Sequence, residues 1–164
     1  MKKTRIIALV AAVLMLAGAL VGCFGPTEKK FSKAGMTITL DSSFYEKDVV
    51  SYTATYTSQQ IVVMAIKEEF SLFEDAGVDA DALTLDEYAE LVLYGNMLEA
   101  EIEHKDGLTG FIFENDANGK TFKYSSYVFK GTDSFWFVQI GVESDKYEKN
   151  SEQIKTIAKS IVVE

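Results

Sequence analysis

The sequence is poor in the residues on which many protein functions depend. Its 164 residues include one cysteine, one histidine, one proline and one tryptophan, and no arginine follows Arg5. A single cysteine excludes an internal disulfide and a zinc site built from several thiolates. Without a further arginine, the chain after Arg5 lacks the group that recognises phosphate and carboxylate in a bidentate manner. The sequence therefore predicts no metal site and no cofactor.

The first 22 residues have the three parts of an export leader. Lys2, Lys3 and Arg5 form a positive start, residues 6–20 form an apolar run, and the small residue Gly22 precedes Cys23. Basic residues before an apolar segment stay on the cytoplasmic side of the membrane. The chain after the leader is therefore expected on the extracytoplasmic side.

The four residues Leu20-Val21-Gly22-Cys23 resemble the lipobox of bacterial lipoproteins. That resemblance implies cleavage before Cys23, a diacylglycerol on its thiol, and usually a further acyl chain, such as palmitate, on the new amino group. Residues 1–22 would then be a signal peptide and residues 23–34 a lipidated tether. Two alternatives stay open: ordinary secretion, and an uncleaved transmembrane anchor, because about twenty uncharged residues suffice to cross a bilayer.

The acidic balance of the chain limits its partners. The net charge is −9, and loss of the leader with Lys2, Lys3 and Arg5 changes it to −12. Such a field repels a phosphate backbone, so no nucleic acid is expected as partner. It also disfavours direct docking on anionic lipids, so that residence at the cell membrane would depend on the lipid on Cys23.

Residues 35–164 are predicted to form a single domain of alternating strands and helices. Period-two alternation of apolar residues predicts strands over the ranges 36–40, 51–57 and 98–104. Runs between turn residues predict further strands over 61–66, 108–114, 120–130 and 135–142, and 61–66, 120–130 and 135–142 have apolar or large residues on both faces. The acidic stretch 68–83 is expected to be a loop with one helical turn near residues 71–75. Thr84-Leu85-Asp86-Glu87 fits a capping box that opens a helix of about three turns. A closing amphipathic helix is expected to be capped by Ser144.

These elements predict an α+β fold, a largely antiparallel sheet of about six or seven strands with helices on both faces. The opening Gly35-Met36-Thr37-Ile38-Thr39-Leu40, the helix at Thr84-Leu85-Asp86-Glu87-Tyr88 and the ending Ile157-Ala158-Lys159-Ser160-Ile161 enclose an aromatic meander. This order is similar to that of the PsbP/Mog1-like superfamily, whose members mostly act as binding or assembly factors. The rival interpretation is a cystatin-like or NTF2-like curved sheet packed on a helix.

Few residues outside the leader are candidates for chemistry. His104 is the only histidine, and no local nucleophile motif surrounds it, which favours an ordinary residue at a strand end. Glu99, Glu101 and Glu103 have period-two spacing and are expected to project from one face of a strand, either as a solvated edge or as a weak cation patch. Four aromatic residues near predicted loops are candidates for a surface groove: Tyr45, Phe70, Phe73 and Tyr94.

The sequence thus predicts no catalytic residue. The interpretation it favours is a membrane-anchored, non-enzymatic binding or assembly module, with an envelope protein as its partner. Two alternatives remain: a cell-envelope hydrolase that uses acidic residues, and a lipoprotein that binds a cation or solute weakly.

Overall fold

The computed structural model describes residues 27–164, and the leader with Leu20, Val21, Gly22 and Cys23 lies outside the described residues. Ten strands are present in this range: β1 (Glu28–Lys33), β2 (Met36–Asp41), β3 (Tyr45–Glu46), β4 (Ala54–Thr57), β5 (Ile61–Glu69), β6 (Glu103–Lys105), β7 (Leu108–Ala117), β8 (Lys120–Lys130), β9 (Ser134–Glu143) and β10 (Val162–Val163). The helices are α2 (Phe70–Glu74), α3 (Leu85–Gly95), the 3-10 turn η1 (Ser144–Lys146) and α4 (Tyr147–Lys159). No helix among these is long and apolar enough to cross a membrane.

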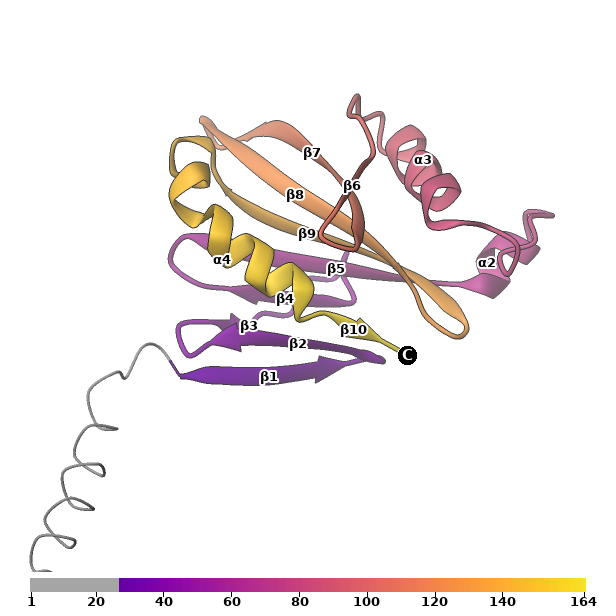
Figure 1. The fold of residues 1–164 in the computed structure, drawn as a ribbon, viewed down its shortest axis with the longest axis horizontal. Coiled ribbons are helices and arrows are strands. Elements are labelled where there is room, and N and C mark those ends of the chain that lie inside the picture. The colour runs from indigo at the N-terminus through magenta and orange to yellow at the C-terminus, as the bar shows by residue number, and fades with distance from the viewer. Residues whose placement is uncertain (1–26) are drawn as a thin grey trace, which may run out of the picture.

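Seven strands form one antiparallel sheet in the order β3-β4-β5-β9-β8-β7-β6 (Figure 1). The predicted α+β fold, a largely antiparallel sheet of about six or seven strands with helices on both faces, is therefore confirmed. A second sheet of three strands, in the order β1-β2-β10, lies beside it and was not predicted as a separate layer. We call the face of the large sheet that packs against this small sheet and α4 the α4 face. The opposite face, which packs against α2 and α3, is the α3 face.

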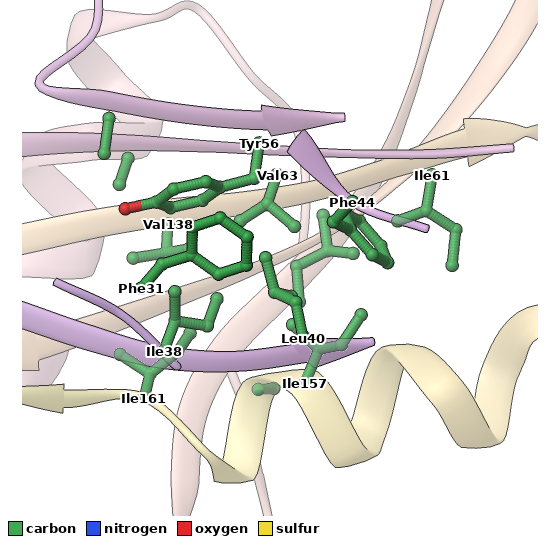
Figure 2. Packing of buried hydrophobic residues seen from close by; sticks show 14 of the residues in the cluster. Phe31, Ile38, Leu40, Phe44, Tyr56, Ile61, Val63, Val138, Ile157 and Ile161 are labelled. Carbon is green, nitrogen blue, oxygen red and sulfur yellow. The ribbon is translucent and has the colours of Figure 1, made fainter. Parts of the chain in front are cut away.

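The main core fills the space between the α4 face, the small sheet and α4. Figure 2 shows Phe31, Ile38 and Leu40 of the small sheet pointing toward Tyr56 and Val63 of the large one. Side chains from β9 and α4 complete this cluster: Trp136, Val138, Ile140, Val142, Ile154, Ile157 and Ala158. β9 lies in the middle of the sheet and is buried on both faces, which explains why its sequence is mostly apolar. The neighbouring strand β5 is buried on the α4 face and half-buried on the other.

A second core on the α3 face is built mainly from aromatic rings. Phe135 of β9 lies under Tyr88 of α3, with ring centroids 4.3 Å apart in a stacked arrangement. Phe70 and Phe73 of α2 pack against the same Phe135 ring at 5.1 and 5.6 Å. The Tyr88 hydroxyl donates a hydrogen bond to the Glu68 carboxylate at 2.5 Å, which gives this buried phenol a polar partner.

Several local predictions are confirmed. The Thr84 hydroxyl accepts from the amide of Glu87, whose carboxylate accepts from the Thr84 amide, so α3 opens with the predicted capping box. The strand β8 has the predicted bounds. The turns at Asp106-Gly107 and Asn118-Gly119 have positive φ at both residues, which is typical of two-residue hairpins.

Two predictions about element boundaries are wrong. The tether was expected to extend to residue 34, but residues 28–33 form β1, paired with β2 through a turn at Ala34-Gly35. The strand predicted over 98–104 is limited to β6 at residues 103–105. The start of that range instead closes the C-terminal end of α3. Met97 has a φ of 53°, and the amide of the next residue, Leu98, donates a hydrogen bond back to the Leu93 carbonyl.

The predicted cap of the last helix is also wrong. Ser144 lies in η1, and α4 begins three residues later at Tyr147 without a side-chain cap. The Ser144 hydroxyl oxygen is buried and has no hydrogen-bond partner among the described residues. The helical segment therefore begins with the 3-10 turn η1, and α4 follows it directly.

Candidate functional site

A cleft of about 420 Å³ lies on the α4 face, between α4 and the strands β6, β7 and β8. It forms because the small sheet covers the β4-β5-β9 side of the large sheet and leaves the β8-β7-β6 side to α4 alone. Its volume is within the range of sites that bind small ligands or a few side chains. The walls are formed mainly by Ile112, Lys123, Ser125 and Tyr127 from the sheet and Tyr147, Glu148, Ser151, Glu152 and Lys155 from α4.

Hydroxyl groups meet in the cleft. Ser125 is 2% exposed, and its hydroxyl is hydrogen-bonded to the phenol of Tyr147, with 2.7 Å between the oxygens. Tyr127 is half-buried beside them. Burial raises the pKa of the Tyr127 phenol above its usual value, and the Ser125 hydroxyl partly opposes that change. Because hydroxyls both donate and accept, this group can adapt to either kind of polar ligand atom.

Gly110 allows the Tyr127 ring to lie against β7. A Cβ at position 110 would lie 2.1 Å from the Ser126 carbonyl oxygen and 2.9 Å from the Tyr127 ring. Both distances are shorter than the contacts that real Cβ atoms make, and the one to the backbone oxygen is far shorter. A glycine at this position is therefore required for the shape of the cleft.

An ion-pair cluster joins α4 to the turn between β6 and β7. The Asp106 carboxylate lies 2.8 Å from the Lys155 ammonium and 3.1 Å from that of Lys159. Hydrogen bonds from Lys155 and then Lys159 hold the pKa of Asp106 below its usual value. The cluster connects two elements that are far apart in the sequence and fixes one end of the cleft.

The remaining charges of the cleft are mostly acidic. Glu103, Glu148 and Glu152 form no ion pair with another residue of the range 27–164. The Lys123 ammonium lies 4.4 Å from the centroid of the Tyr147 ring, a cation–π arrangement. Lys105 and Lys123 also line the cleft without an ion-pair partner among the described residues, so three such carboxylates against two such ammonium groups leave a slight negative excess. This excess favours a ligand that carries positive charge.

His104, the only histidine, lies on the α3 face and outside the cleft. One ring nitrogen is 3.2 Å from the Asp86 carboxylate, and the other is 3.3 Å from the Thr109 hydroxyl. Sequence reasoning did not predict this arrangement of hydroxyl, imidazole and carboxylate. The His104 and Asp86 side chains are 60% and 53% exposed, so water surrounds the trio. The geometry suits a surface contact between β6 and α3.

The three glutamates with period-two spacing separate in the structure. Glu99 and Glu101 are exposed in the segment between α3 and β6, so the prediction that all three project from one strand is wrong. Their alternation with Leu98, Ala100 and Ile102 has a physical cause, since these apolar residues pack against the second core. Within residues 27–164, no three acidic, histidine or cysteine side chains are arranged to hold a metal ion.

The four aromatic candidates do not share a groove. Phe70 is buried in the second core and Phe73 packs against that core, whereas Tyr45 and Tyr94 are exposed. Tyr94 lies at the end of α3 beside Leu91 and Met97, which are also exposed. None of the four lines the cleft. The sequence signal that does point to the cleft is the alternation of Lys123, Ser125 and Tyr127 along β8.

Comparisons with known proteins identify the fold of this chain. No protein-family model matches the chain, and no curated protein matches its sequence. Among solved structures, cyanobacterial PsbP (CyanoP) from Synechocystis sp. PCC 6803 matches with a TM-score of 0.51 and 15% identity, over 87% of this chain and 96% of that one. The Ran-binding protein Mog1p of Saccharomyces cerevisiae matches with a TM-score of 0.55 and 10% identity, over 85% of this chain and 96% of its own.

A Bacteroides thetaiotaomicron protein also matches, with a TM-score of 0.53 and 13% identity, over 83% of this chain and 48% of that one. At such identities a structural match shows the fold and nothing more. The fold is the α+β sandwich of the PsbP/Mog1-like class, which the sequence pattern had predicted.

Proposed function

We propose that this protein is a lipid-anchored, non-enzymatic binding or assembly module on the extracytoplasmic side of the cell membrane. The anchor is the diacylglycerol on Cys23, after cleavage following Leu20-Val21-Gly22. Binding takes place on the α4 face, in the cleft between α4 and β6–β8. The partner is an envelope protein held near the same membrane.

The single observation that carries this function is the cleft itself. The buried hydroxyl of Ser125 in the cleft is hydrogen-bonded to a phenol, and His104 lies on the opposite face of the sheet. A hydroxyl nucleophile needs a base within hydrogen-bond distance, whereas recognition needs only donors, acceptors and charges in fixed positions. The cleft provides the second set of features. In support, one protein with this fold is described as a Ran-binding protein, so the fold can serve recognition.

The anchor is tested by mass and by location. The intact mass of the membrane-extracted protein should lack residues 1–22 and include a diacylglyceryl group on Cys23. Cys23→Ala should leave the domain folded and change its membrane association. An unmodified full-length mass would contradict the lipoprotein assignment and leave the binding assignment standing.

The binding site is tested by photocrosslinking in native membranes. A photoreactive amino acid replaces Ser151, a half-buried residue of α4 in the cleft wall, and in a matched variant it replaces Leu72, an exposed residue of α2 on the α3 face. We expect a discrete protein adduct from position 151 and none from position 72. Equal adducts from both positions would contradict a site in the cleft. Absence of any protein adduct, together with hydrolysis of envelope material that Glu152→Gln abolishes, would favour the hydrolase.

A further inference from the structure

The strand β7 has an open edge next to the cleft. β7 comprises residues 108–117, but β6 pairs only with residues 108–110. From Phe111 to Ala117 the strand has β8 on one side and no strand on the other within the described range. Seven residues of backbone at the margin of the large sheet therefore lack a neighbouring strand.

Hairpin geometry shows which backbone groups face this open edge. Ala117 and Lys120 flank the two-residue turn, so their amides and carbonyls are directed at each other. In an antiparallel ladder this orientation alternates with every residue. The N–H and C=O groups of Asp116, Glu114 and Ile112 are thus directed outward.

The hairpin between β6 and β7 gives the same alternation of inward and outward backbone groups independently. Lys105 and Leu108 flank the turn at Asp106-Gly107, so Leu108 and Gly110 direct their backbone groups toward β6. Continuing the alternation along β7 by two residues again directs the groups of Ile112 away from β8. The outward groups therefore continue the line along which β6 already pairs.

The side chains of these residues lie on the cleft side of the sheet. Ile112 is paired with Ser125 and Glu114 with Lys123, and Ser125 and Lys123 line the cleft. Residues opposite each other in a ladder share a face. Ile112 lines the cleft directly and is 38% exposed. A strand added at this edge would place every second side chain in or beside the cleft.

We propose that an extended, basic segment of a partner protein adds to β7 as an eighth strand of the large sheet, with alternate lysine or arginine side chains directed toward the cleft. The inference rests on the proposed function and specifies its partner. Backbone hydrogen bonds to Ile112, Glu114 and Asp116 hold the segment, and side-chain contacts provide its specificity.

The charges around the edge select a basic occupant. Glu114 and Asp116 are exposed on the edge itself, and Glu103, Glu148 and Glu152 line the cleft beside it. Lys105 and Lys123 line the cleft too and offset two of these five carboxylates, which leaves an acidic excess. A second copy of this chain would place Glu114 and Asp116 opposite the same carboxylates, and like charges across a ladder are destabilising. The same charges that protect the edge from pairing with itself therefore favour a basic strand.

The test uses a defined probe and the lipidated protein in nanodiscs of zwitterionic phosphatidylcholine, which does not attract a cationic peptide. The probe is a nine-residue peptide of alternating lysine and valine. We expect it to slow amide exchange at Ile112, Glu114 and Asp116 by about tenfold or more, read residue by residue. The same peptide with N-methyl groups on the residues that face β7 should have no effect, and a glutamate–valine peptide should not bind.

Two variants separate the backbone contact from the charge. Glu114→Pro removes an amide that faces outward and leaves the ladder with β8 intact, so the fold should persist and peptide binding should be lost. Glu114→Gln keeps the amide and should weaken binding by up to about fivefold. Glu74→Gln on α2 makes the same charge change on the α3 face and should leave binding unaltered.

The results that overturn the inference differ from those that overturn the proposed function. Equal binding of the N-methylated peptide, exchange protection elsewhere than on β7, or no binding at millimolar peptide would each overturn strand addition. If Glu114→Pro does not fold, the N-methylated peptide decides the question by itself. A photocrosslink from position 151 that persists in any of these cases leaves the binding site in the cleft and excludes only its occupation by a strand.

Discussion

The two faces of the large sheet are covered in different ways. On the α3 face, two helices close over stacked aromatic rings, and the main polar contact inside is the hydrogen bond from Tyr88 to Glu68. On the α4 face, a small sheet and one helix share the cover, and their junction leaves the cleft with its hydroxyls and carboxylates. The α3 face thus contributes to stability, whereas the α4 face combines a core with the candidate site. The difference follows from how much of each face is covered.

The largest effect is expected where the α4 face is fully sealed. Trp136 has no exposed surface, and Trp136→Ala should cost about 3–5 kcal/mol of unfolding free energy through the cavity it leaves. Trp136→Phe is the matched control and should cost less, since the indole nitrogen has no partner among the described residues. Urea unfolding followed by far-ultraviolet circular dichroism measures both. A loss below 1 kcal/mol for the alanine variant would show that this side is not tightly packed.

An intermediate effect is expected on the α3 face. Tyr88→Phe removes the hydroxyl that donates to Glu68 and should lower the unfolding free energy by about 1–2 kcal/mol. Burial raises the pKa of this phenol well above its usual value, so the hydroxyl stays a donor at all working pH values. Tyr94→Phe, at an exposed position of the same helix, should have no measurable effect. Equal effects of both variants would remove the contrast between core and surface on α3.

The smallest effect on stability is expected from the ion pairs of Asp106 at one end of the cleft. The pKa of Asp106 is lowered below its usual 3.8, so carboxyl resonances should give a titration midpoint below that value. The stabilisation is present above the unfolded-state pKa and is lost as the pH falls through the lowered folded-state pKa. Lys155→Gln should move the midpoint upward, and Lys149→Gln, an exposed change on the same helix, should not. A midpoint unaffected by Lys155→Gln would show that the ion pair is absent in solution.

The sequence predicted the elements whose causes are local. The Thr84–Glu87 capping box and the Asn118-Gly119 turn depend on residues within four positions of each other, and both are present. The strand β1 was missed because only Phe31 is buried in it and its lysines resemble a tether. Its pairing depends on a turn at Ala34-Gly35, and alanine is unusual at positive φ.

The candidate site was less accessible to sequence reasoning. The hydroxyls of Ser125 and Tyr147 are 22 residues apart, and only the packing of α4 on β8 brings them together. The contact of His104 with Asp86 likewise depends on how α3 lies against β6. Periodicity assigns a residue to a face of its own element, but it does not say which other element covers that face. The cleft depends on which elements pack against β6, β7 and β8.

The central claim is that the α4 face, and not the α3 face, binds the partner at the membrane. Hydrogen exchange of the lipidated protein, compared between its native membrane and the purified state, tests this claim most directly. We predict slower exchange in native membranes over residues 108–117 and 147–155, which bound the cleft, with residues 70–97 unchanged. Protection confined to residues 70–97, or identical exchange in both states, would contradict the account.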